Sequence, residues 1–262
     1  MALKLDVITL GAPEVPAARA FYAAALSPIV AGTGTGSGTG DPVSLDMHGT
    51  GRFELSATEQ PAGPGFRGYV LSYVVNQPTE VRTVMEAAAR GGAEVLKPAK
   101  KALFGSFSGV FRAPDGAIWK LAAATSKDTG TPAETPHPTE TTVILGVPAP
   151  KTAKVFYEAL GMTVDRDYGN KYVDFHPAKA ATRLCLMERG VLARDAGTTK
   201  EGDGFRSIVF TCRAESREEV DALLTAASAA GGRITVPAAE TAEGGYSGRF
   251  TDPDDFLWEV TH

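Results

Sequence analysis

The sequence predicts an α+β protein built from two tandem β-α-β-β-β modules. Its two halves repeat each other, because Trp119 returns as Trp258 and Ser108 returns as Ser247, each 139 positions later. Short apolar segments rich in β-branched residues alternate with segments whose apolar residues recur every three to four positions. A repeat of this length far exceeds the roughly 20–50 residues of solenoids and propellers, so it indicates a duplicated module.

The repeat divides the chain into residues 1–124, a linker at residues 125–140, and residues 141–262. The prolines and threonines of the linker predict an extended tether. Such a tether allows the modules to pair within one chain or to exchange between two chains, so a monomer and a homodimer both remain open.

The elements of each module follow in the same order. The first has a strand at 7–10, a helix at 15–26, a strand pair at 45–48 and 53–56, a strand at 69–75, a helix at 79–90 and a final strand pair that carries Trp119. The second has strands at 143–147, 172–176, 183–187 and 207–212, helices at 150–160 and 216–230, and a final pair that carries Trp258. Glycine pairs at 91–92 and 231–232 predict the ends of two helices.

Composition excludes several classes of function. The net charge of −5 disfavours nucleic acid as a partner, and no apolar run reaches the roughly 18 residues that span a membrane. The N-terminus lacks the apolar core of a signal peptide, so we expect a cytoplasmic protein. Cys185 and Cys212 lie in apolar runs, which predicts buried thiols. The glycine-rich segment 32–40 opens no helix and is expected to be a surface loop rather than a phosphate site.

Several motifs give the chain a family resemblance. They are the segments 8–11 and 20–22, Gly161, and the segments 246–250 and 252–259. Together they resemble the vicinal oxygen chelate superfamily, which includes glyoxalase I, extradiol dioxygenases and bleomycin-resistance proteins. The resemblance implies curved mixed sheets with the helices outside, each module curling its own sheet. It implies little about function, because this fold hosts enzymes and binding proteins alike.

Metal-using members of that superfamily are expected to hold a divalent ion with His or Gln, His, and Glu from three strand positions per module. The residues at those positions here are Val7, Gly68 and Lys120 in the first module and Thr142, Ser207 and Glu259 in the second. Glu259 alone is a usual ligand, and one carboxylate with two hydroxyls is a poor metal site. The expectation is therefore a protein without a metal or other cofactor.

Other residues could contribute to a site. His48 and His176 end matching Asp-x-His motifs, so an Asp could orient the imidazole for acid–base work; alternatively, each histidine ends its strand in solvent. Phe104, Phe107 and Tyr246 precede the last hairpins and could stack on a flat ligand, or pack between the modules.

These observations favour a protein that binds a small organic molecule in a sheet-lined cavity, similar to the antibiotic-sequestering members of the superfamily. Thr142, Ser207 and Glu259 would supply polar groups from one module and Lys120 from the other. The opposite charges of Lys120 and Glu259 could orient a zwitterionic or amide-rich ligand. A metal-dependent lyase, isomerase or dioxygenase, and a structural or regulatory protein with a degenerate site, remain alternatives.

Overall fold

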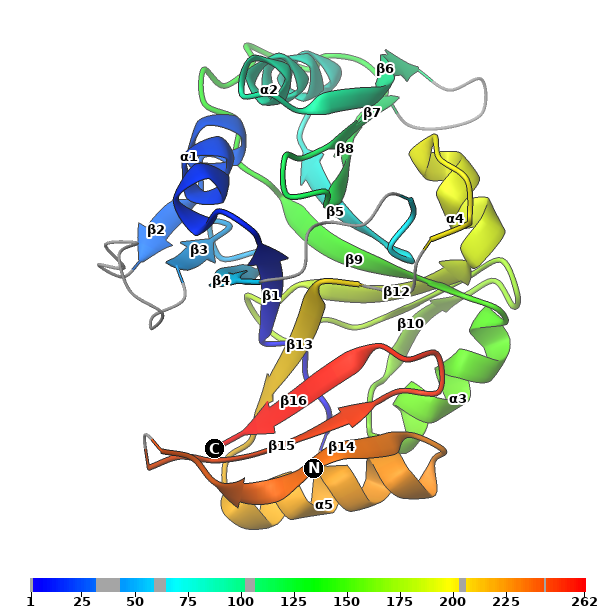
Figure 1. The fold of residues 1–262 in the computed structure, drawn as a ribbon. Helices are drawn as coiled ribbons and strands as arrows, with labels where there is room; N and C mark the ends of the chain where they lie inside the picture. Colours follow the sequence, from blue (N-terminus) through cyan, green and yellow to red (C-terminus); the bar gives the residue numbers. More distant parts are fainter. Residues whose placement is uncertain (1, 32–42, 59–64, 102–106, 203–205, 243) are drawn as a thin grey trace.

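The computed structural model describes residues 2–31, 43–58, 65–101, 107–202, 206–242 and 244–262. Within them the chain forms four consecutive β-α-β-β-β units, two in each half (Figure 1). The predicted glycine-rich loop at 32–40 falls largely outside the described residues, as does Phe104. None of the described helices is long and apolar enough to cross a membrane.

The first half contains two units. The first comprises β1 (Val7–Ala12), α1 (Val15–Leu26), β2 (Ile29–Ala31), β3 (Val43–Asp46) and β4 (Arg52–Ala57). The second comprises β5 (Tyr69–Val75), α2 (Pro78–Arg90), β6 (Glu94–Lys101), β7 (Phe107–Arg112) and β8 (Ile118–Ala123).

The second half repeats this order with one addition. The third unit comprises β9 (Glu140–Val147), α3 (Pro150–Ala159), β10 (Val164–Asp167), β11 (Tyr172–Phe175) and β12 (Arg183–Glu188). It is followed by the extra helix α4 (Arg189–Ala196), which the sequence analysis missed. The fourth unit comprises β13 (Ile208–Arg213), α5 (Arg217–Ala229), β14 (Arg233–Glu240), β15 (Tyr246–Thr251) and β16 (Leu257–Thr261).

The strands form two eight-stranded sheets, and each sheet combines both halves of the chain. The first sheet has the order β14-β15-β16-β13-β1-β4-β3-β2, and the second has the order β10-β11-β12-β9-β5-β8-β7-β6. The expectation that each module curls its own sheet is therefore wrong. The halves are joined by antiparallel pairing of β1 with β13 and of β5 with β9.

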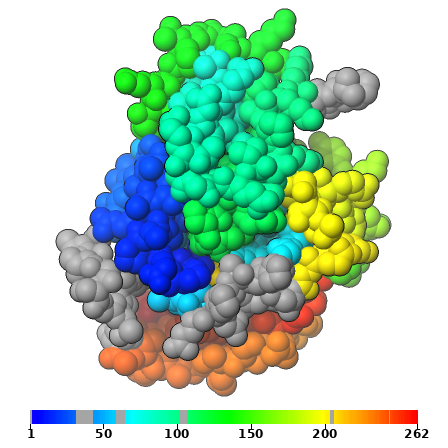
Figure 2. Space-filling view, turned by 45° about the horizontal axis from the view of Figure 1, so that its top comes forward, coloured from blue at the N-terminus to red at the C-terminus, as the bar shows by residue number. Residues whose placement is uncertain are grey.

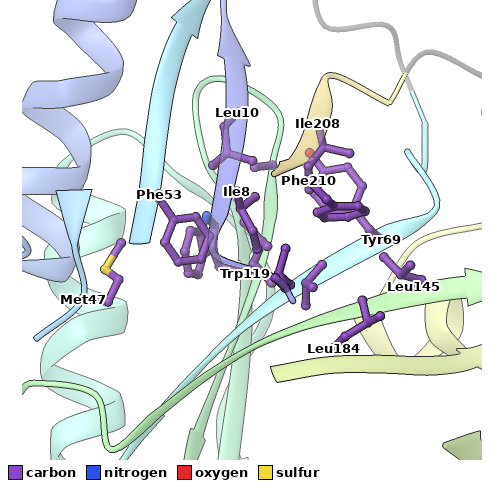
Figure 3. Packing of buried hydrophobic residues seen from close by; sticks show 14 of the residues in the cluster. Ile8, Leu10, Met47, Phe53, Tyr69, Trp119, Leu145, Leu184, Ile208 and Phe210 are labelled. Carbon is purple, nitrogen blue, oxygen red and sulfur yellow. The ribbon is translucent and has the colours of Figure 1, made fainter. Parts of the chain in front are cut away.

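The two sheets share one hydrophobic core. Ile8 and Phe53 of the first sheet and Tyr69 and Leu145 of the second belong to the same buried cluster (Figure 3). The rings of Phe53 and Trp119 lie 5.5 Å apart between their centroids. Aromatic pairs of this kind add stability beyond the burial of their area. Both tryptophans are buried, and the predicted burial of both cysteine thiols is confirmed.

The linker is held against α2 by buried side chains rather than hanging free. The Gln77 side chain accepts hydrogen bonds from the Thr129 and Gly130 amides at 2.8 and 3.2 Å. The Glu80 carboxylate, 3% exposed, accepts one from the Ala133 amide. In Figure 2 this segment, in bright green, lies directly over α2. The linker is therefore packed against α2 instead of being an exposed tether. We call its residues 128–133 the strap.

Replacement of Gln77 by alanine is expected to loosen this strap. The substitution removes the side-chain oxygen that accepts from two linker amides. Because residue 77 is buried, the loss lowers the unfolding free energy by about 1–3 kcal/mol. Hydrogen exchange should accelerate in residues 128–133, and urea denaturation should give the loss of stability. Glu86→Ala, on an exposed position of the same helix, is the control. Unchanged exchange in the Gln77 variant would show that other contacts hold the strap.

Candidate binding site

Each sheet has one face that joins the shared core and one that does not. In β1 the side chains of Ile8 and Leu10 enter the core, so the alternate residues Val7 and Thr9 point to the opposite side. Helices α1 and α5 pack against the core side of the first sheet, and α2 and α3 against that of the second. We call the opposite side of each sheet its inner face.

The two inner faces can be compared position by position, because the strands pair in the same way. One row of the first sheet contains Ser44, Glu54, Thr9 and Val209, which are direct neighbours on β3, β4, β1 and β13. The matching row of the second sheet contains Asp174, Cys185, Ile144 and Val70. Thr9 and Glu54 thus occupy positions that hold an isoleucine and a cysteine in the other sheet.

A second row shows the same relation. In the first sheet it contains Val7, Thr211, Glu259 and Arg249. In the second sheet the matching residues are Thr142, Ser72, Lys120 and Val110. Lys120 and Glu259 therefore hold equivalent positions on different sheets.

Helix α4 covers the inner face of the second sheet. Its residues Leu192, Ala193 and Ala196 form a second buried cluster whose sheet members are Val70, Val110, Ile118, Ile144 and Cys185. The Glu188 side chain caps the start of α4 by accepting from the amides of Gly190 and Val191. The Lys97 ammonium donates to two carbonyls in its last turn. This face is filled by the protein's own side chains.

The inner face of the first sheet carries polar and partly exposed side chains instead. Thr9, Ser44 and Glu54 are each half-buried, as are Val209 and Leu257. Neighbouring side chains in such a row stand about 5 Å apart, so the hydroxyls of Thr9 and Ser44 flank the Glu54 carboxylate. Among the described residues, Glu54 has no hydrogen-bond or ion-pair partner.

Glu259 lies on the same inner face but is not free. Its carboxylate accepts from Arg249 Nε and Nη2 at 2.9 and 2.8 Å. Both nitrogens contact the same oxygen, Oε1, and this charge-assisted contact restrains both side chains. Three inter-strand steps of about 4.8 Å separate β4 from β16, so Glu54 and the Arg249–Glu259 pair stand at two sides of one polar surface.

Comparison with known proteins identifies the fold. Residues 139–260 match the family model of the Glyoxalase/Bleomycin resistance protein/Dioxygenase superfamily. These residues, the second half of the chain, form a domain of this superfamily. No curated protein matches the chain.

Solved structures of this superfamily extend the likeness to the whole chain. Glyoxalase I from Zea mays superposes with a TM-score of 0.69 at 16% identity, covering 99% of this chain and 92% of its own. A putative dioxygenase from Bacillus subtilis gives a TM-score of 0.62 at 17% identity, covering 99% and 85%. At such identities the likeness shows a shared fold over the whole chain and leaves the activity to be argued from the site.

The side chains on this inner face do not fit a divalent metal ion. Across the described ranges, no group of three or more His, Cys, Asp or Glu side chains is placed to hold an ion. On the inner face of the first sheet, Arg249 occupies the carboxylate of Glu259, and the residue beside it is Thr211. Divalent metals need several converging nitrogen, oxygen or sulfur donors. We therefore derive no chemical step through a metal.

The structure separates the residues that the sequence analysis grouped into one cavity. Lys120 lies on the second sheet, where its ammonium pairs with Asp195 of α4 at 2.5 Å. Thr142 lies on the same sheet and is 6% exposed. The idea that Lys120 and Glu259 orient one ligand from two sides is therefore wrong.

Ser207 and Gly68 lie outside the strands on which they were expected. Both have positive φ, 53° and 86°, and each immediately precedes its strand. The Ser207 hydroxyl donates to the Gly11 carbonyl at 2.9 Å and so ties β13 to β1. The inner-face residue of β13 beside Glu259 is Thr211 instead.

The two described aromatic candidates pack on the protein itself. Phe107 is buried, with Arg82 stacked on its ring at 4.5 Å. The Tyr246 hydroxyl donates to Asp221 of α5 at 3.0 Å.

The histidines are held in turns at strand ends. His48 stacks on His137 of the linker, with 3.6 Å between ring centroids, and its Nε2 donates to the Ser27 carbonyl. His176 is 58% exposed and lies 3.8 Å from Asp165. It borders a cavity of about 190 Å³ beside the N-terminal segment. Neither histidine is oriented by the Asp of its own motif, because Asp46 accepts from the Gly49 amide and Asp174 binds Arg166.

Sequence reasoning missed Glu54, Thr9 and Ser44. The signal was present, since Glu54 lies between the apolar residues Phe53 and Leu55 of a predicted strand. The register between β1 and β4 was needed to place it beside Thr9.

Proposed function

We propose that the protein binds a small organic molecule on the inner face of its first sheet, without a metal ion. The contrast between the two inner faces carries this proposal. Helix α4 covers the second face and packs on Ile144 and Cys185, whereas the equivalent positions of the first face hold the partly exposed Thr9 and Glu54. A polar side chain at a position where the other sheet packs an apolar one lowers the stability of the folded protein. Ligand binding at that position would explain why the polar side chain is there.

The chemistry of the face limits the class of ligand. The Glu54 carboxylate suits a protonated amine or another hydrogen-bond donor, with the hydroxyls of Thr9 and Ser44 as further partners. Val209 and Leu257 suit an apolar part of the molecule. The ligand is therefore amphipathic with a donor-rich or cationic group, which fits a sequestering role similar to that named for bleomycin-resistance proteins of the superfamily.

A native mass spectrum of untagged protein, recorded before and after EDTA treatment, tests the proposal. We expect an organic passenger of a few hundred daltons that survives EDTA. One divalent metal per chain, with the passenger lost on chelation, would instead indicate a metal-dependent enzyme. A metal-free protein that binds nothing from an amine-rich compound library would indicate a structural role.

Substitutions on the two sheets then locate the site. Glu54→Gln keeps the shape of the side chain but removes its charge, and should weaken binding of the passenger by about tenfold or more. Glu259→Gln should weaken it also, because it frees Arg249. Lys120→Met, at the equivalent position of the covered sheet, is the matched control and should leave affinity unchanged in titration calorimetry. Equal losses in all three variants would contradict the proposed location.

A further inference from the structure

Two arginine side chains meet over Gly68, outside the face described above. Arg189 is the first residue of α4, and Arg206 precedes β13. A Cβ atom built on Gly68 would collide with Nη1 of both arginines. The two nitrogens are therefore within about 5 Å of each other, a distance at which like charges repel strongly.

Three other nitrogens of these guanidinium groups are already bound. Arg189 donates from Nη2 to the Phe66 carbonyl and from Nε to the Lys200 carbonyl, both at 3.1 Å. Arg206 donates from Nη2 to the Asp254 carbonyl at 2.6 Å. These bonds aim the two Nη1 groups at a common point.

The remaining donors are poorly satisfied. Arg206 Nη1 reaches only the Arg67 carbonyl, at 3.5 Å, and Arg189 Nη1 has no acceptor within the described part of the chain. Carbonyl groups satisfy donors but carry no net negative charge, so they leave the two positive charges unbalanced.

No described carboxylate pairs with either guanidinium. The acidic groups that act on them, Glu201 on Arg189 and Asp252, Asp254 and Asp255 on Arg206, lie beyond ion-pair distance. Burial lowers the pKa of both arginines, and the charge of Arg189 lowers that of Arg206 further.

Stacking restrains both groups in this arrangement. The Arg206 guanidinium lies 3.8 Å from the centroid of Phe256, and that of Arg189 lies 5.2 Å from the centroid of Phe66. Both arginines are half-buried, so part of each side chain remains in contact with solvent. Two fixed, converging, partly desolvated donors of the same charge form a preorganised receptor for an anion.

We propose that Arg189 and Arg206 bind an oxyanion of the phosphate type above Gly68. A doubly charged tetrahedral anion balances two guanidinium charges and offers separate oxygens to the two Nη1 groups. The amides at the start of α4 take no part, because the Glu188 carboxylate occupies them. Gly68, with φ of 86° and no Cβ atom, lets both Nη1 groups approach the backbone at this point.

Titration of the full chain with inorganic phosphate and with phenyl phosphate, at constant ionic strength in sodium chloride, tests this site. We expect saturable binding of one phosphate per chain in calorimetry. Tighter binding of phenyl phosphate would identify the natural source as an organic phosphate, and equal or weaker binding would identify free phosphate. No saturation by either compound up to about 20 mM, the weak end of specific affinity, would overturn the proposal.

Variants separate this site from a merely structural cluster. Arg189→Gln should weaken phosphate binding by about tenfold or more. Arg194→Gln, which removes the same charge from an outward position on the same helix, should not.

Without phosphate, the unfolding temperature of Arg189→Gln should stay near that of the wild type, because relief of repulsion offsets the lost hydrogen bonds. Added phosphate should raise the unfolding temperature of the wild type and of Glu54→Gln but not that of Arg189→Gln. Equal phosphate affinity in both arginine variants would refute the assignment.

Discussion

The Leu192→Ala variant is expected to lose about 2–5 kcal/mol of unfolding free energy, the range for a fully buried leucine. Leu192 is 1% exposed and sits at the centre of the cluster that α4 forms with the second sheet. Removing three carbons there leaves a cavity between Val70, Val110 and Ile144, which belong to two strands and an edge hairpin that cannot easily close together. Urea denaturation followed by circular dichroism measures the loss.

Val191→Ala provides the matched control. Val191 precedes Leu192 on the same helix, but 43% of it is exposed. Its truncation should cost less than about 1 kcal/mol, as is usual at such surface positions. If the two variants lost equal stability, α4 would not be packed into the sheet as described, and the second inner face would become a candidate site.

The second large effect is a pH dependence that arises from Asp252. Burial raises the pKa of this carboxyl to about 6, although the Tyr157 hydroxyl and the Phe256 amide donate to it and lower the pKa. Because the folded-state pKa lies above the unfolded one, the native protein binds more protons between the two values. Stability from this group is therefore fully present below about pH 4 and is lost as the pH rises through about 6.

An Asp252→Asn variant removes this dependence. Relative to the variant, the wild type should lose about 3 kcal/mol of stability between pH 4 and pH 7. Chemical denaturation at a series of pH values gives the difference. Asp255→Asn, an exposed carboxyl in the same turn, should keep the wild-type slope. If the unfolding free energy of the Asp252→Asn variant changed with pH as steeply as that of the wild type, the Asp252 carboxyl would not be held in the buried state described here.

The element pattern could be predicted because it depends on local periodicity. The segment around Phe21 shows helical spacing, and the segments around Ile8 and Tyr69 show strand composition. Helix α4 could not be recognised, since it has only eight residues, and Leu192, Ala193 and Ala196 form too short an apolar pattern. That omission mattered, because α4 decides which inner face is covered.

The candidate site could be predicted only in part. Glu259 was found from a motif beside Trp258, and the structure places it on the first inner face. Of its expected companions, Thr142 lies on the other sheet, and the register of β13 against β16 places Thr211, and not Ser207, beside it.

The sequence by itself determined the duplication, the order of most strands and helices, and the burial of Cys185 and Cys212. These features follow from repeated spacing and from side-chain polarity. Both can be recognised from short segments of the sequence. Only the tertiary structure decided that β1 pairs with β13 and β5 with β9, because backbone hydrogen bonds are the same for every partner strand. It also decided which polar residues share a face: one step of register moves a side chain to the opposite side of its sheet.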